Sequence, residues 1–293
     1  MTRSVRWGIS LVLVLGFCVA AQGQESYLDE YVVHVKPGKR AEFDSLIKKM
    51  AAANRANGGD NWTATETTYG NTDIVTFVSG RGSYGDIEKA SAALMGAMGK
   101  AMGRPATEKL FADLSDCSAE SQGVLLRMRP DLSSNLPTDM AEREKIVGGR
   151  RWIRTTRIVV RFGMAPRFEA LAKEVKAARE KSDSKTLVWI TQSAAGDMNG
   201  VYYVNQLESS LEGFDSPAID LQKIMGDEAF QKLMKAGSEV IEKEDVTISH
   251  FLPELSNPTA AMVDASPDFW RPKATAAKPA AAKSGAAKAS EEK

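Results

Sequence analysis

Two histidines are the residues of this chain best suited to ligate a haem iron or to move protons near neutral pH. His34 lies in a strand-like segment near the start of the chain, and His250 lies in another near its end. A strand histidine that is half exposed, or satisfied by one hydrogen bond, would have a purely structural role. Strand alternation does not fix the face that either ring takes. Metal ligation has less support, because the sequence lacks HxH, CxxC and HExxH spacings.

Aromatic residues gather in the segments expected to form hairpin strands. Such rings can simply fill a core, or they can form a pocket for a small apolar or aromatic molecule that hydroxyl, imidazole or guanidinium groups orient. The sequence predicts no catalytic residue, no cofactor and no metal. The candidate ligand-binding residues are His34, Trp62, Tyr69, Arg127, Trp189, Tyr203 and His250.

The chain has two cysteines, Cys18 and Cys117. Cys18 falls in a predicted signal peptide, so Cys117 would have no partner for an internal disulfide. The polar residues around Cys117 indicate a loop thiol between a helix and a strand. We expect its replacement to cost little stability.

The segments that would position these residues occur twice. Residues 35–46 resemble residues 160–171, with a shift of 125 positions. Residues 102–110 resemble 225–233, and residues 129–133 resemble 252–256, both with a shift of 123. A nearly constant shift along half a chain indicates duplication. Two copies favour a pair related by a pseudo-twofold axis.

Each copy has the residue pattern of a β-α-β-β-α-β unit. This order predicts an α+β fold of two tandem ferredoxin-like units. Two helices cover one face of each four-stranded sheet, so the bare faces should pack sheet to sheet as an internal pseudo-dimer. The predicted boundaries are a first unit at 27–133, a linker at 134–150 and a second unit at 151–257. In the first unit we expect strands at 31–35, 62–69, 74–78 and 122–128, with helices from 39, at 84–102 and at 106–114; in the second, strands at 157–162, 186–192, 201–206 and 246–252, with helices at 166–181, 219–225 and 228–241.

The two ends of the chain have distinct compositions. Residues 1–23 combine Arg3 and Arg6, an apolar run and small residues at positions 21 and 23, as in a cleaved signal peptide. The apolar run is shorter than the roughly 20 residues of a membrane span, so no transmembrane segment is expected after cleavage. Residues 258–293 are predicted to be a disordered tail rich in Ala, Lys and Pro. We therefore expect an exported protein, periplasmic or secreted.

Charge excludes one class of partner. The 38 basic and 38 acidic residues balance, which gives no basis for nucleic-acid binding.

The segment VKPGKRAEF at 35–43 resembles the first strand and helix start of the dimeric α/β-barrel superfamily, which includes antibiotic-biosynthesis-monooxygenase-like domains. The segment MGDEAFQKL at 225–233 is similar to the short helix before the last strand in that group. The resemblance spans residues 27–256 and implies the fold more than the activity. Haem-degrading members place a histidine on a helix with an asparagine partner, and neither histidine here lies in a helical segment.

These observations lead to one interpretation and two alternatives. The first is an exported, non-catalytic protein that binds a small apolar or aromatic molecule. The alternatives are a cofactor-independent or haem-linked monooxygenase-like oxidoreductase, and a cell-envelope interaction protein that uses the Ala/Lys tail. In each case we expect a monomer, because the second unit supplies the sheet that a second subunit would supply in single-unit relatives.

Overall fold

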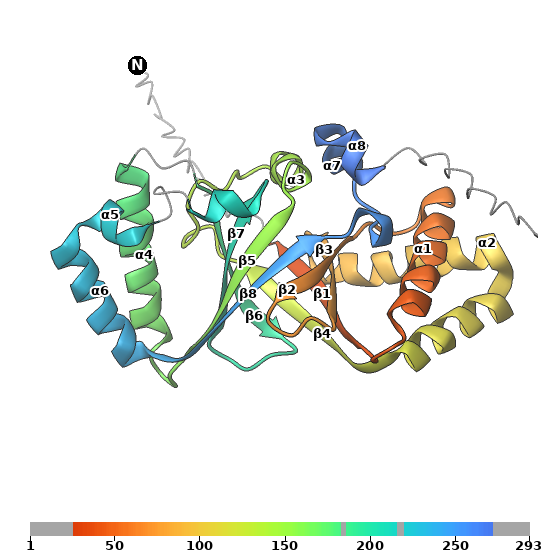
Figure 1. Ribbon diagram of the computed structural model, residues 1–293, viewed down its shortest axis with the longest axis horizontal. Coiled ribbons are helices and arrows are strands. Elements are labelled where there is room, and N and C mark those ends of the chain that lie inside the picture. Colours follow the sequence, from red (N-terminus) through yellow and green to blue (C-terminus); the bar gives the residue numbers. More distant parts are fainter. Residues whose placement is uncertain (1–25, 183–185, 216–219, 272–293) are drawn as a thin grey trace, which may run out of the picture.

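Both halves of the chain fold as ferredoxin-like units, and their eight strands join in one closed barrel (Figure 1). The computed structural model describes residues 26–182, 186–215 and 220–271. The first unit comprises β1 (Tyr27–Val35), α1 (Arg40–Ala56), β2 (Thr63–Tyr69), β3 (Ile74–Arg81), α2 (Tyr84–Cys117) and β4 (Ser118–Met128). The second comprises β5 (Trp152–Val160), α4 (Ala165–Lys181), β6 (Val188–Ala195), β7 (Val201–Glu208), α5 (Leu221–Met225), α6 (Asp227–Val240) and β8 (Ile241–Phe251).

The strand order around the barrel is β1-β3-β2-β8-β5-β7-β6-β4. Each unit supplies four adjacent strands. The outer strands of the two sheets pair in an antiparallel way, β2 with β8 and β4 with β6. This pairing satisfies the backbone groups that an isolated sheet would expose at its edges. It also encloses the two sheet faces that no helix covers, which confirms the predicted internal pseudo-dimer.

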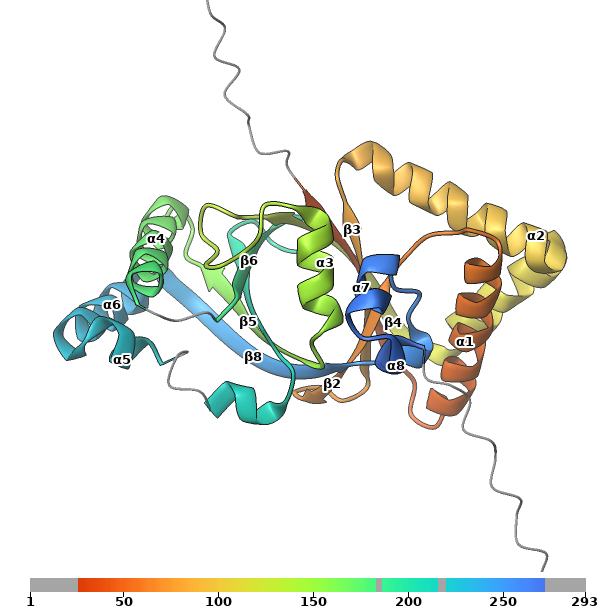
Figure 2. The ribbon, with the colours of Figure 1, turned by 90° about the horizontal axis from the view of Figure 1, so that it is seen from above.

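The helices lie outside the barrel in two layers. Helices α1 and α2 flank it on one side and α4, α5 and α6 on the other (Figures 1 and 2). In the first layer Phe43, Ile47 and Met98 are buried against the sheet. In the second, the ring of Phe168 packs on that of Tyr202, with centroids 4.6 Å apart.

Glycines at equivalent positions of the two units have the same backbone conformation, as expected for a duplicated chain. Gly38 and Gly163, 125 positions apart, both have φ of 78° and lie between the first strand and first helix of their units. Gly103 and Gly226, 123 positions apart, have φ/ψ of 75°/163° and 80°/160°. Glycine adopts such positive φ values without the penalty that a Cβ imposes. The same two positions therefore shape both units.

Gly103 also explains a difference from the expected elements. The sequence predicts two helical pieces separated at Pro105, whereas α2 breaks at Gly103 and Pro105 lies in the first turn of the continuing helix. Proline is tolerated there, because the first amide groups of a helix have no intrahelical acceptor.

The prediction of a loop thiol at Cys117 is wrong. Cys117 is the last residue of α2 and is fully buried in the core of the first unit. The polar neighbours that suggested a loop belong to the exposed side of the same helix end. Burial raises the pKa of the thiol.

The segments expected to be a linker and the start of a tail are ordered in part. Helix α3 (Met140–Gly148) lies between the units, and α7 (Ala260–Ala265) and α8 (Pro267–Trp270) follow the second. Trp270 donates its indole N–H to the Gly148 carbonyl oxygen at 2.9 Å and is buried with Val147. The large apolar side chains near Trp270 provide this burial. The remainder of the predicted tail and the whole predicted signal peptide lie outside the described residues.

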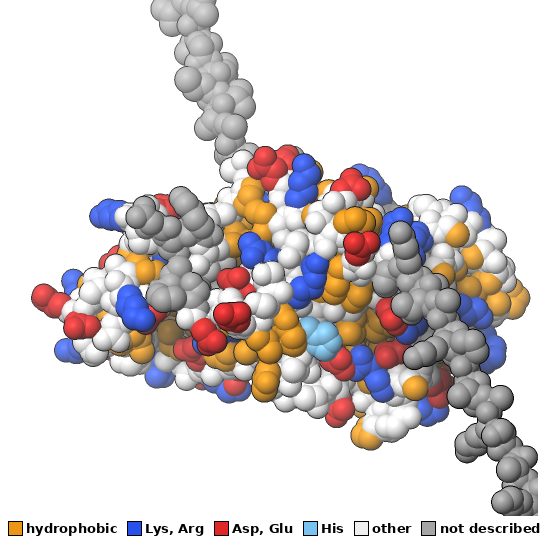
Figure 3. All heavy atoms as spheres, turned by 45° about the horizontal axis from the view of Figure 1, so that its top comes forward, with side chains coloured by type: hydrophobic (Ala, Val, Ile, Leu, Met, Phe, Trp, Pro, Cys, Tyr) orange, Lys and Arg blue, Asp and Glu red, His pale blue; other side chains and the backbone are white. Residues whose placement is uncertain are grey.

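Two properties of the described part bear on partners. None of its helices combines the length and apolar character that crossing a bilayer requires. On the face seen in Figure 3, acidic and basic side chains are interspersed, so that face has no continuous basic surface.

Candidate functional site

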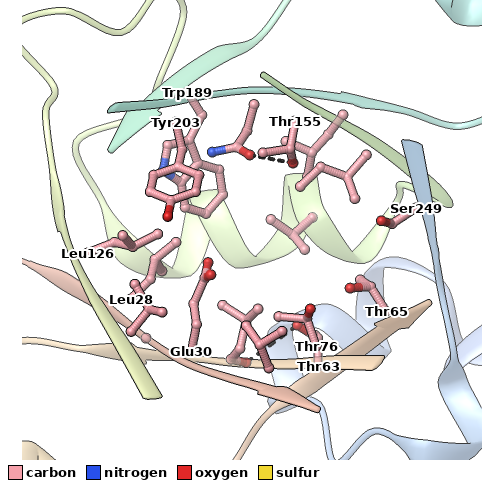
Figure 4. A pocket seen from close by; sticks show the side chains of 18 of the residues that line it. Leu28, Glu30, Thr63, Thr65, Thr76, Leu126, Thr155, Trp189, Tyr203 and Ser249 are labelled. Carbon is pink, nitrogen blue, oxygen red and sulfur yellow. Dashed lines mark hydrogen bonds between the residues drawn. The ribbon is translucent and has the colours of Figure 1, made fainter. Parts of the chain in front are cut away.

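A cavity of about 540 Å³ lies inside the barrel, between the two sheets. Successive side chains of a strand point to opposite faces, so alternate residues reach the interior. In β1 these residues are Leu28, Glu30 and Val32 (Figure 4). Val33 and Val35 point instead into the helix-side core of the first unit.

One end of the barrel interior is lined by the segments that were expected to be irregular. Met140 and Val147 of α3 and Met262 of α7 belong to the cavity wall. Arg143 of α3 donates to the carbonyl oxygens of Pro137 and Thr138. These segments therefore complete the cavity as well as joining the units.

The wall of the cavity mixes apolar side chains with hydroxyl groups. Its apolar part includes Leu28, Val78, Val124 and Leu126. The hydroxyl groups come from both units and could bind a ligand's polar atoms. They belong to Thr63, Thr65, Thr67, Thr76, Thr155, Thr247 and Ser249.

Glu30 is the charged group at the middle of this wall. Its carboxylate points into the cavity (Figure 4). No described residue forms a hydrogen bond or ion pair with it, and its neighbours across the sheet are Val78 and Val124. Burial, and then the nearby charge of Asp29, raise the pKa of Glu30 from 4.5 to about 7. The side chain counts as half-buried because the cavity admits solvent, although the barrel screens it from bulk water.

A second charged group in the wall is fully paired. Arg157 of β5 binds both carboxylate oxygens of Asp197 at 2.9 and 2.7 Å, and Tyr203 of β7 donates its hydroxyl to Asp197 at 2.5 Å. Burial alone would raise the pKa of Asp197, but the bonds from Arg157 and Tyr203 lower it overall. Burial, and then the bond to Asp197, raise the pKa of Tyr203. This network is a stable ion pair and leaves little charge for a ligand.

Two further contacts fix neutral groups in the wall. Thr155 donates its hydroxyl to the Asn205 side-chain oxygen at 2.8 Å, which leaves the amide N–H groups of Asn205 as donors. Trp189 donates its indole N–H to the Met128 sulfur at 2.9 Å.

Of the seven candidate residues from the sequence, the structure brings Trp189 and Tyr203 to the cavity. Trp62 is buried on the helix side of the first sheet and donates its indole N–H to the Leu255 carbonyl oxygen. Tyr69, at the end of β2, is 59% exposed.

The remaining three candidates also lie outside the cavity. Arg127 is exposed on the outer face of β4. His34 lies at the end of β1, beyond the last cavity-lining residue of that strand. His250 lies on the outer face of β8, where its Nδ1 is 2.9 Å from the Thr68 hydroxyl oxygen. A shift of one residue along a strand reverses the face, and the sequence did not determine that phase.

Sequence reasoning missed Glu30 and the hydroxyl groups. The expected first strand began at residue 31, where the β-rich run YVVHV starts. The strand in fact begins at Tyr27, with Asp29 outside and Glu30 inside. The alternation Leu28, Glu30, Val32 could have indicated an inward face that contains one charge.

The cavity residues do not fit a haem group. Haem iron requires an axial ligand, most often histidine, at the site. Neither histidine lines the cavity, the Tyr203 hydroxyl is bonded to Asp197, and the Met128 sulfur accepts a bond from Trp189.

No protein-family model matches the sequence, and no curated protein matches it. Among solved structures, it is similar to a candidate monooxygenase from Fusobacterium nucleatum subsp. nucleatum ATCC 25586, with a TM-score of 0.49 and 11% identity over 78% of this chain and 92% of the other. A candidate monooxygenase from Lactobacillus acidophilus NCFM gives 0.48 and 9%, over 77% and 93%. A heme-binding protein from Thermus thermophilus gives 0.44 and 10%, over 80% and 93%.

At these identities the likeness concerns architecture alone. The strand order and the edge pairing show that this chain has the dimeric α/β-barrel architecture, closed within one polypeptide.

Proposed function

We propose that this protein binds one small organic molecule inside its barrel. The observation that carries the proposal is the cavity of about 540 Å³ enclosed by both sheets. Small-molecule sites are typically concave, about 300–1,000 Å³ in volume, and mostly apolar with a few polar groups that fix orientation. The valine and leucine side chains, the hydroxyl groups and Glu30 match that description.

The size of the cavity also argues for an occupant. Protein interiors are close-packed, and an empty cavity loses the contacts of every group that lines it. Water can fill a polar cavity, but an organic molecule that contacts the apolar wall would release that water and restore those contacts.

A cavity-filling variant tests the proposal. Leu28→Trp adds bulk to the cavity wall, while Tyr31→Trp adds a comparable indole on the opposite, exposed side of the same strand. Ligand-observed NMR with a panel of small aromatic alcohols and amines should show binding to the wild type and to Tyr31→Trp. Binding to Leu28→Trp should be at least tenfold weaker. A panel that fails to bind, or binding that Leu28→Trp leaves unchanged, contradicts the proposal.

A monooxygenase-like reaction is a second candidate function, and Glu30 is the observation that favours it. A carboxylate with a pKa near 7 suits proton transfer at neutral pH. It could accept the proton of a phenolic substrate that reacts with dioxygen. Oxygen uptake with a phenol such as hydroquinone, lost in Glu30→Gln, would support this candidate. Uptake unaffected by that substitution would reject it.

We also propose that the protein is exported and acts as a monomer. The positive and apolar character of residues 1–23 supports export, and closure of the barrel within one chain supports the monomer. N-terminal sequencing of the mature protein and light scattering test the two statements. A chain that retains Met1, or a mass of twice that of one mature chain that persists on dilution, would contradict them.

A further inference from the structure

The cavity wall carries an excess of negative charge. Two basic residues face four carboxylates: the basic residues are Arg143 and Arg157, and the carboxylates are Glu30, Glu144, Asp197 and Asp245. Asp245 also pairs with Lys243, outside the wall, at 2.8 Å. Both arginines are already engaged, Arg143 by carbonyl oxygens near α3 and Arg157 by Asp197. No basic side chain in the described part of the wall is left to neutralise Glu30.

The surroundings of Glu30 complement a cation. Its partners across the sheet are the apolar Val78 and Val124, and the rings of Trp189 and Tyr203 lie on the opposite wall (Figure 4). The faces of such rings attract cations. A positively charged group between Glu30 and these rings would find an anion on one side and aromatic faces on the other.

We propose that the molecule bound in the barrel is a small organic amine in its protonated form, and that the Glu30 carboxylate is its counter-ion. This inference rests on the proposed function and specifies the chemical class of its ligand. The ammonium group would donate charge-assisted hydrogen bonds to Glu30, and the apolar part of the molecule would contact Leu28, Val78 and Leu126.

The energetics favour such a ligand over a neutral one. Burying an ion pair is costly because both ions lose their hydration. In the free protein Glu30 is already screened from bulk water, so its carboxylate loses less hydration on binding than a fully exposed carboxylate would. A neutral molecule would leave the buried carboxylate without a counter-charge.

The state of Glu30 also makes binding dependent on pH. The other titratable groups in the cavity wall are Tyr27 of β1, Arg143 and Glu144 of α3, Arg157 of β5, Asp197 between β6 and β7, Tyr203 of β7 and Asp245 of β8. Asp29, on the outer face of β1, lies near Arg81, with the guanidinium Nε 3.4 Å from its carboxylate.

Only the ionised form of Glu30 can pair with an amine, and its pKa is about 7. At pH 5.5 roughly 3% of a group with that pKa is ionised, and at pH 8.5 nearly all of it is. Apparent affinity scales with the competent fraction, so affinity for an amine should rise about 30-fold over this range.

Isothermal titration calorimetry with 2-phenylethylamine and its neutral analogue 2-phenylethanol tests the inference. The wild type at pH 8.5 should bind the amine at least tenfold more tightly than the alcohol. Glu30→Gln keeps the shape of the side chain and should remove this preference and the pH dependence. Glu120→Gln, on an exposed part of β4, is the matched control and should change neither.

The wild-type pH profile is independent of how any variant folds. Equal affinities for amine and alcohol, or amine binding that is flat between pH 5.5 and 8.5, would overturn the inference while leaving the proposed function in place. If neither compound binds, the proposed function fails and the inference fails with it.

Discussion

Glu30 and Thr155 occupy equivalent positions in the two halves of the barrel but have opposite surroundings. Glu30 pairs across the sheet with Val78 and Val124, and Thr155 pairs with Asn205 and Thr247. Thr155 has a hydrogen bond to Asn205, whereas the cross-strand neighbours of Glu30 are aliphatic and offer none. The second half therefore satisfies its polar group within the protein, and the first half leaves one open to a ligand.

The next inward pair continues the contrast. Val32 and Thr76 of the first half correspond to Arg157 and Tyr203 of the second. Charge appears at this level only in the second half, and there Asp197 neutralises it. The duplicated backbone therefore accommodates both a paired and an unpaired charge. The unpaired charge occurs at residue 30 and not at the equivalent position of the second unit.

The largest loss of stability is expected from a second carboxylate at the equivalent position of the second unit. We expect Thr155→Glu to lose the bond to Asn205 and to place a second unpaired carboxylate in the cavity wall. The free energy of unfolding at pH 8.5 should fall by about 3 kcal/mol, the scale of an uncompensated buried charge. Urea denaturation measures it. Val246→Glu, on the 45% exposed side chain of Val246 in β8, should cost under about 1 kcal/mol. Equal losses would show that the cavity is not a special environment.

Replacing the Glu30 carboxylate by a neutral amide should remove the charge difference between the two equivalent positions. The folded-state pKa of Glu30 is above its unfolded value, so between pH 4.5 and 7 the folded protein holds a proton that the unfolded chain has released. Stability from Glu30 is thus present below pH 4.5 and is lost as the pH rises to about 7. We expect Glu30→Gln to be about 2 kcal/mol more stable than the wild type at pH 8, after allowance for water in the cavity.

The same two proteins should have equal stability near pH 4.5. Urea unfolding across the range from pH 4.5 to 8 measures the difference. Parallel curves for the variant and the wild type would mean that Glu30 is as well solvated in the barrel as in water.

Disrupting the network of Arg157, Asp197 and Tyr203 in the second unit should cause a smaller loss of stability. Asp197→Asn removes the carboxylate that binds Arg157 and Tyr203. Hydrogen bonds to charged groups contribute about 1.5–3 kcal/mol, but Arg157 keeps Asp245 at 3.9 Å. We expect a loss of about 1–2 kcal/mol in thermal or urea unfolding. Asp245→Asn is the control and should lose less; the reverse order would show that Asp245 is the principal partner of Arg157.

The smallest change in the free energy of unfolding is expected where the equivalent residues of the two units are equally buried. Cys117 corresponds to Val240, and both are fully buried where the last helix meets the last strand. Cys117→Val should therefore change the free energy of unfolding by less than about 1 kcal/mol, since it keeps an apolar side chain of similar size. Cys117→Ser should cost more, because it buries a hydroxyl group in an apolar core. A larger loss in the valine variant would indicate that the thiol itself is needed.

Most of the fold could be predicted from the sequence. The repeated VKPG and MG segments contain the positive-φ glycines at positions 38 and 226, and the residue patterns indicated the β-α-β-β-α-β order of each unit. The face-to-face packing of the two sheets followed from their bare faces, whereas the edge pairing that closes the barrel did not. The ordered helices α3, α7 and α8 were missed because their few apolar residues are buried by contacts distant in sequence, as Trp270 is by Gly148.

The candidate site could be predicted much less well. Trp189 and Tyr203 were included because aromatic residues in hairpin strands suit a pocket. Glu30 was not among the candidates because the first strand was expected to start at residue 31, four residues after its actual start at Tyr27, and composition alone does not reveal a charge inside a barrel. Face assignment depends on the exact phase of each strand, which the sequence did not determine, so Arg127 and His250 stood among the candidates although they lie outside the cavity.

The connection of both units in one polypeptide has a consequence for orientation. A barrel assembled from two identical subunits would present residue 30 twice, so any bound molecule would meet the same group from either direction. Here the carboxylate of Glu30 corresponds to a neutral threonine in the second unit, so the two halves of the interior differ. A molecule that enters this barrel needs no twofold symmetry of its own and can bind in a single orientation. Fusion thus allows the cavity to distinguish the head of a ligand from its tail.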